Sequence, residues 1–123
     1  MEINELIGKT FVSVEQKGVE EIIFTEADGT KYIQYHDQDC CECVLIEEVH
    51  GDLSDLVGAP IAQAEEVISQ NETPDGFPAV EYPDSYTWTF YKLATIKGYV
   101  TIRWLGESNG YYSESVYMRK EAA

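Results

Sequence analysis

Short stretches in which apolar and polar residues alternate occur along most of the chain and predict β-strands. Residues 11–15 and 31–36 alternate in this way, and residues 21–25 contain a short apolar run of strand length. Asp28 and Gly29 separate the last two stretches, and an Asp-Gly pair favours the tight turn of a β-hairpin. The first third of the chain therefore predicts three strands.

The final third carries the strongest strand pattern. Residues 86–93, 99–105 and 111–118 are rich in aromatic and β-branched side chains, which favour strands. Lys97 and Gly98 separate the first two stretches, and a Gly- and Ser-containing segment at 106–110 separates the last two. This region predicts a C-terminal three-stranded β-meander.

The middle of the chain is less regular. Residues 43–49 have strand composition, and residues 62–69 mix helix-favouring Ala and Glu with an imperfect alternation that we interpret as an edge strand. Residues 3–7 and 52–58 predict short helical turns, whereas residues 70–85 are polar, rich in proline and predict a loop. The predicted fold is mainly β with antiparallel sheets and one or two short helices, and α+β is the alternative.

Length and charge limit the classes of function. A chain of 123 residues predicts a single globular domain over 1–123 with its own hydrophobic core. The sequence has 23 acidic and 8 basic residues, and its net charge is −15. We expect no direct binding to nucleic acid, because phosphate backbones are bound through Lys and Arg. A strongly acidic surface instead attracts basic proteins, although it also serves solubility alone.

The segment that begins at Met1 is acidic where a secretory signal would be basic, and no apolar run reaches the length of a membrane span. We therefore expect a cytoplasmic protein without a membrane partner. In a reducing compartment, neighbouring cysteines are interpreted as thiols or metal ligands rather than as disulfides.

All three cysteines and both histidines fall between residues 36 and 50. The spacing is His36-x3-Cys40-x2-Cys43-x6-His50, with Cys41 as a spare or alternate ligand. Thiolates and imidazoles in such a set are the ligands of a tetrahedral structural zinc, so we predict Zn²⁺ at these residues. If residues 31–36 and 43–49 form a hairpin, it would place His36 opposite the cysteines. The alternative is a chance cluster in which the cysteines are buried as small apolar side chains.

Alternation along a strand restricts which thiols can cooperate. Adjacent residues of an extended segment point to opposite faces, so Cys40 and Cys41 should not bind the same metal. A turn would bring Cys40 and Cys43 together, whereas a regular strand would place Cys41 and Cys43 on one face. The pattern leaves both arrangements open.

A catalytic Cys-His pair would use the same residues. The neighbouring acidic side chains disfavour a thiolate unless a cation compensates, and a bound zinc would be such a cation. These acidic neighbours are Asp37, Asp39, Glu42, Glu47 and Glu48. We therefore expect a structural metal site and no enzymatic activity, with a metal-dependent or thiol enzyme acting on a small molecule as the alternative.

Polar and aromatic residues at 109–115, together with Trp88 and Trp104, are a second candidate binding surface. Aromatic residues on consecutive strands are more often core, and we favour that interpretation. Glu65 and Glu66 are likewise interpreted as a solvated strand edge.

Several segments resemble a family of small acidic proteins of unknown function that are encoded by phages and prophages, and this resemblance implies no particular activity. The resemblance rests on residues 35–42, 51–53, 56–61, 64–67, 87–92, 97–104 and 108–113. Compact acidic phage proteins resemble anti-CRISPR inhibitors, and a metal-containing type II inhibitor of Cas9 is the most similar kind. This resemblance implies a binding protein in the host cytosol that inhibits a nucleic-acid-handling effector, Cas9 first, by occupying its basic surface.

Overall fold

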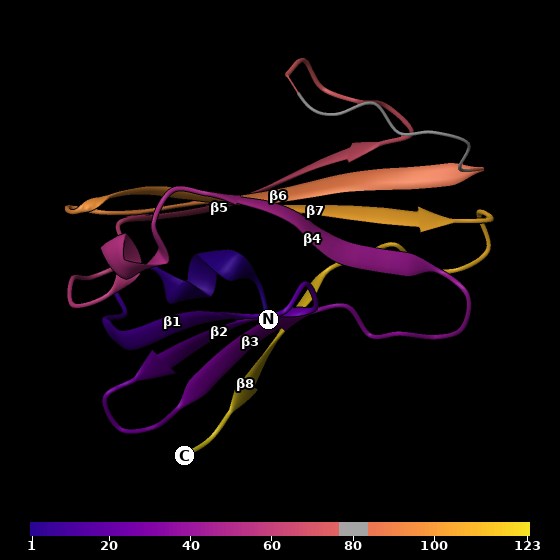
Figure 1. Cartoon of the computed structure of the whole chain (residues 1–123). Coiled ribbons are helices and arrows are strands. Elements are labelled where there is room, and N and C mark those ends of the chain that lie inside the picture. Colours follow the sequence, from indigo (N-terminus) through magenta and orange to yellow (C-terminus); the bar gives the residue numbers. More distant parts are fainter. Residues whose placement is uncertain (77–83) are drawn as a thin grey trace.

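Two antiparallel four-stranded sheets pack face to face in the computed structural model, which describes residues 1–76 and 84–123 (Figure 1). The first sheet has the order β1-β2-β3-β8, and the second has the order β4-β7-β6-β5. The strands of the first sheet are β1 (Phe11–Lys17), β2 (Glu21–Glu26), β3 (Lys31–Tyr35) and β8 (Tyr117–Glu121). Those of the second are β4 (Cys43–His50), β5 (Gln63–Gln70), β6 (Ser85–Thr95) and β7 (Gly98–Ser108). The mainly β prediction is thus confirmed.

Two short 3-10 turns lie where helical turns were predicted. They are η1 (Ile3–Leu6) and η2 (Leu53–Leu56), and Leu6 and Leu56 are buried. Asp52 begins the second turn, because its carboxylate accepts the backbone N–H of Ser54 at 2.9 Å. Among the described residues, no helix is long and apolar enough to cross a membrane.

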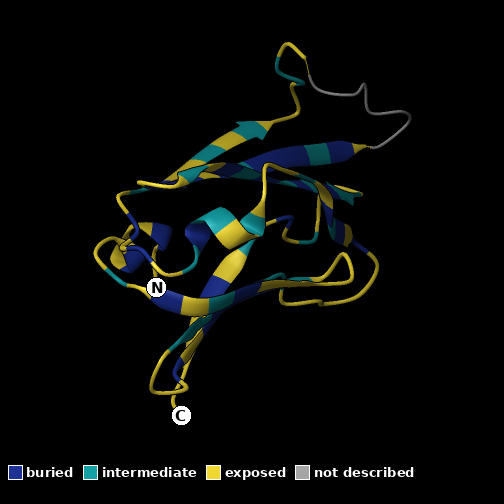
Figure 2. Cartoon of the chain, turned by 60° about the vertical axis from the view of Figure 1, so that its left-hand side comes forward, coloured by how far each residue is buried: buried dark blue, intermediate teal, exposed yellow. Residues whose placement is uncertain are grey.

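The hydrophobic core lies between the two sheets. Phe24 of β2 and Tyr32 of β3 belong to the same cluster as Ile102 and Trp104 of β7. β6 is buried along most of its length, as Figure 2 shows, because it pairs with both β5 and β7 in the middle of its sheet. Burial of these side chains is the main contribution to the stability of the fold.

The predicted C-terminal meander is wrong in its third strand. β6 and β7 form the expected hairpin, but residues 111–116 are not a strand. β8 begins at Tyr117 and pairs with β3 in the opposite sheet, with Tyr35 opposite Tyr117. The reason is local: Glu114 is buried against β7 and holds this part of the chain by hydrogen bonds from side chains instead of a strand ladder.

The predicted hairpin of residues 31–36 with 43–49 is also wrong. Both stretches are strands, but β3 and β4 belong to different sheets, and the segment between them crosses from one sheet to the other (Figure 1). β5 is an edge strand, as predicted. The predicted loop at 70–85 begins after Gln70, and residues 77–83 lie outside the described residues.

Candidate functional site

The segment between β3 and β4 is organised by Glu42, whose residue surface is 4 % exposed. Its Oε2 accepts hydrogen bonds from the backbone N–H of Asp39 at 2.9 Å and from Nε2 of His36 at 2.8 Å. Its Oε1 accepts the backbone N–H of Cys40 at 2.9 Å. The backbone N–H of Asp39, followed by His36, lowers the pKa of Glu42 to about 2.

His36 links this segment to the other end of the chain. Its Nδ1 lies 2.6 Å from the backbone carbonyl oxygen of Ser115, and its Nε2 faces Glu42. The carbonyl and the carboxylate both accept hydrogen bonds, so each ring nitrogen of His36 faces an acceptor. The side chains of His36 and Glu42 are almost fully buried, at 3 % and 0 % exposure.

The three cysteines are arranged differently from either predicted geometry. Cys40 and Cys41 are joined by a disulfide, although thiols were expected. Cys43 is a free, exposed cysteine at the start of β4, opposite Glu107 of β7. Cys43 therefore has no second free thiol, from Cys40 or from Cys41, with which to bind a metal.

His50 lies at the opposite end of β4 from Cys43 and faces Thr101 in the strand ladder. Seven steps along a strand separate the two residues by about 23 Å, far beyond the reach of one metal ion. Within the described ranges, no group of three or more His, Cys, Asp or Glu side chains is placed to hold a metal. The predicted set of His36, Cys40, Cys43 and His50 does not fit one tetrahedral zinc in this arrangement, and zinc binding itself stays a prediction.

The β1–β2 turn, the segment 36–42 and β4 each carry acidic side chains. The turn is attached to β4 by a hydrogen bond from the backbone N–H of Ile46 to the carbonyl of Val19, at 2.7 Å. A small cavity of about 310 Å³ is lined by Glu20 from the turn, by Glu21 at the start of β2 and by Gln38 from the segment. We call this surface the acidic end and define it as Glu20, Glu21, Asp37, Asp39, Glu47 and Glu48.

Two arginines moderate the charge of the acidic end. Arg103 of β7 pairs with Glu47 and Glu48, each at 2.5 Å, and Arg119 of β8 lies 4.0 Å from Glu21. Glu20, Asp37 and Asp39 are exposed. These exposed carboxylates give the surface its negative field.

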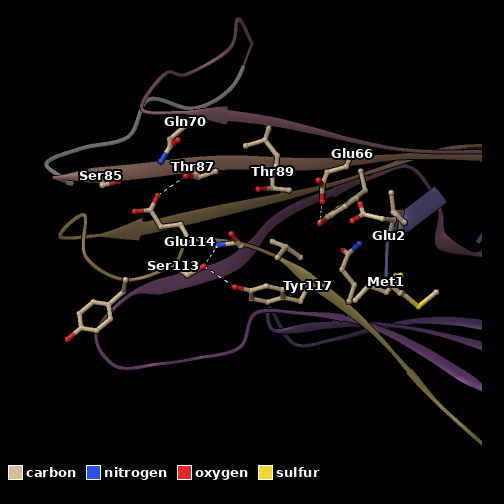
Figure 3. Close-up of a pocket in the computed structure, with 18 of the residues that line it drawn as sticks. Met1, Glu2, Glu66, Gln70, Ser85, Thr87, Thr89, Ser113, Glu114 and Tyr117 are labelled. Atoms are coloured by element: carbon tan, nitrogen blue, oxygen red, sulfur yellow. Dashed lines mark hydrogen bonds between the residues drawn. The ribbon is translucent and has the colours of Figure 1, made fainter. Parts of the chain in front are cut away.

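A larger cleft of about 610 Å³ opens between the two sheets, beyond the apolar core (Figure 3). From β6, it is lined by Ser85, Thr87, Thr89 and Tyr91, which point inward on alternate positions. From β5, it is lined by Glu66, Ile68 and Gln70, which stand opposite Tyr91, Thr89 and Thr87. The same faces carry Leu93 and Ala64 in the core, so the inner surface changes from apolar to polar along the strands.

The carboxylates of the cleft are held by hydroxyl groups. The Thr87 hydroxyl donates to Oε1 of Glu114 at 2.7 Å, and the Ser108 hydroxyl donates to Oε2 (Figure 3 shows the first of these bonds). The Tyr91 hydroxyl donates to Oε2 of Glu66 at 2.8 Å. Burial, and then this bond to Glu66, raises the pKa of Tyr91.

The sequence interpretation missed most of this cleft. Residues of the 109–115 segment, including Tyr112 and Glu114, do line it, but Trp88 and Trp104 are buried and do not. Glu66 lines the cleft and is not only a solvated edge residue. The available signal was the row of hydroxyls at every second position from Ser85 to Tyr91, on a face where a sandwich strand is normally apolar.

Comparison with known proteins gives one match. No curated protein and no solved structure is detectably similar to this chain. Residues 4–118 match a family model described as a domain of unknown function, DUF7448. Because the match covers nearly the whole chain, the protein belongs to the DUF7448 family.

Proposed function

We propose that this protein is an acidic binding protein that docks its acidic end on the basic surface of a nucleic-acid-handling protein. The observation that carries the proposal is the net charge of −15, with exposed carboxylates at Glu20, Asp37 and Asp39. Negative charge on a compact surface speeds association with a basic partner and competes there with the phosphates of nucleic acid.

The local structure supports a preformed docking surface. Asp37 and Asp39 lie in a segment whose backbone is fixed by Glu42, and Glu20 lies in a turn attached to β4. Little conformational freedom is then lost on binding, which favours affinity.

The same geometry supports a non-catalytic role for the histidine and cysteine segment. Both ring nitrogens of His36 already contact Glu42 and Ser115, so the ring is not presented to a thiol. A general base must lie within hydrogen-bond reach of the proton that it abstracts. The alternative of a thiol enzyme would require detectable turnover that is lost in Cys43→Ala while the fold is retained.

Cas9 is the specific partner that we propose, on the resemblance to phage-encoded inhibitors. An RNA-guided nuclease holds its RNA–DNA heteroduplex in a positively charged channel, which is the kind of surface that an acidic protein would occupy. The protein would then inhibit cleavage by excluding DNA from this channel.

The test is a pull-down and a DNA-cleavage assay with purified, guide-loaded Cas9 at low salt. We expect a complex and protection of the target, and about tenfold weaker binding after Glu20→Gln, Asp37→Asn and Asp39→Asn are combined. The matched control combines Glu65→Gln, Glu72→Gln and Asp75→Asn, which removes three exposed carboxylates elsewhere. Absence of a complex would reject Cas9 as the partner. Equal losses of affinity in the two combined variants would reject the acidic end as the docking surface.

A further inference from the structure

A buried hydrogen-bond donor without an acceptor lines the cleft between the sheets. Gln34 of β3 is 1 % exposed, and its Oε1 accepts the indole N–H of Trp104 at 2.7 Å. Its Nε2 has no hydrogen-bond partner among the described residues. An indole N–H can only donate, so the amide oxygen must face Trp104 and the NH₂ group is left for the cleft.

The lining around this group restricts the chemistry of a ligand. Glu2, Glu66 and Glu114 contribute carboxylates, and no Lys or Arg is among the described lining residues. A phosphate or carboxylate ligand would meet like charge there. An ammonium ligand has no acceptor to offer to the NH₂ group of Gln34.

We propose that this cleft binds a neutral, hydroxyl-rich small molecule of the size of a mono- or disaccharide. Each ligand hydroxyl can accept from Gln34 or Thr89 and donate to a carboxylate, so it matches a lining of mixed donors and acceptors. Apolar side chains such as Ile68 and Met118, with the ring of Tyr112, can contact the C–H faces of such a molecule. A cleft of about 610 Å³ lies within the usual volume of small-molecule sites.

This site is independent of the proposed docking of the acidic end. It is formed by β3, β5, β6 and the segment before β8, whereas the acidic end lies at the β1–β2 turn, the segment 36–42 and β4. Failure of one proposal therefore leaves the other untouched.

The test is a titration of the full ¹⁵N-labelled chain with neutral saccharides, namely glucose, N-acetylglucosamine, maltose and cellobiose, followed by NMR. The readout is the side-chain NH₂ signal of Gln34, assigned by its loss in Gln34→Met. The internal control is the side-chain NH₂ of Gln16, which is exposed on β1 and donates to the carbonyl of Gly18. Spermine and inorganic phosphate are titrated as a cationic and an anionic probe.

We expect at least one saccharide to shift the Gln34 signal in a saturable way without moving that of Gln16. Thr89→Val removes a lining hydroxyl at nearly constant shape and should weaken this binding about fivefold to tenfold. Thr101→Val makes the same change at a half-buried position on the outer face of β7, opposite His50, and should leave binding unchanged. The proposal would be overturned if no saccharide shifts the Gln34 signal, or if only spermine or phosphate shifts it. It would also be overturned if Thr89→Val bound saccharide with the same affinity as the native sequence.

Discussion

At the scale of one residue, Glu42 makes a pH-dependent contribution to the stability of the fold. Its pKa falls from an ordinary value of 4.5 to about 2 in the folded chain, through the Asp39 backbone N–H and His36. A carboxylate whose pKa is lowered on folding stabilises the fold above its unfolded pKa. The contribution is therefore complete above pH 4.5 and is lost as the pH falls towards 2.

We predict that Glu42→Gln lowers the denaturant midpoint of unfolding at pH 7, and that the difference from the native sequence shrinks steadily between pH 4.5 and pH 2. Asp37→Asn is the matched control, because it removes an exposed carboxylate from the same segment. A difference between native and Glu42→Gln midpoints that is constant over this range would contradict the role of the ionised carboxylate.

Treatment with a chelator distinguishes two ways in which the segment 36–42 can be ordered, by a bound zinc or by the hydrogen bonds of Glu42. If Glu42 alone orders the segment 36–42, a strong chelator leaves the melting temperature unchanged, and elemental analysis of protein purified without chelator finds no stoichiometric metal. About one zinc per chain, with a melting temperature lowered by chelator, would instead support the zinc predicted at His36, the cysteines and His50.

The sequence indicated that the segment 36–42 is chemically unusual but not which residue organises it. Glu42 looked like one of several acidic neighbours, because burial of a carboxylate depends on which backbone N–H groups the folded segment turns towards it. His36 meets Ser115 across 79 positions of sequence, a contact that local spacing does not encode.

At the scale of elements, Gly106 allows the segment before β8 to pack on β7. A Cβ atom at this position would lie 2.8 Å from Cβ and 2.9 Å from the backbone oxygen of Glu114. We predict that Gly106→Ala lowers the free energy of unfolding by about 1–3 kcal/mol, because the crowded backbone must shift. Chemical denaturation measures this loss.

Gly98→Ala is the control for this change. The added Cβ would approach the end of the Asp55 side chain at 2.7 Å, and a flexible side chain can move aside. The loss should therefore be clearly smaller than in Gly106→Ala. Equal losses would indicate that close approach to Glu114 is not what requires glycine at position 106.

The strand pattern predicted where strands lie better than it predicted their partners. Alternation located β1 and β3, strand composition located β4, and the turn at Asp28 and Gly29 correctly placed β2 beside β3. Partner choice failed for β4 and β8, because each follows a segment that crosses between the sheets. Such crossings depend on contacts like that of Glu114 with Thr87, which are distant in sequence.

At the scale of the whole molecule, the excess of 15 negative charges opposes the compact fold. Screening of like charges by salt weakens this repulsion. We predict that the melting temperature at pH 7 rises as sodium chloride is increased from low to moderate concentration. A melting temperature that falls under these conditions would show that attractive ion pairs, such as those of Arg103, outweigh the repulsion.

The acidic end and the cleft between the sheets are the two candidate functional surfaces. The sequence predicted the first better than the second. The charge of the acidic end follows from composition, whereas the cleft exists only because two sheets diverge beyond their shared core. The hydroxyl row of β6 was readable in the sequence, but the facing residue Gln34 comes from the other sheet.

The central claim is that the acidic end binds a basic partner, and the most direct measurement is the affinity for guide-loaded Cas9 as a function of salt. We expect this affinity to fall steeply as salt rises, and the combination of Glu20→Gln, Asp37→Asn and Asp39→Asn to flatten this dependence. An affinity that is independent of salt, or no complex at low salt, would contradict it.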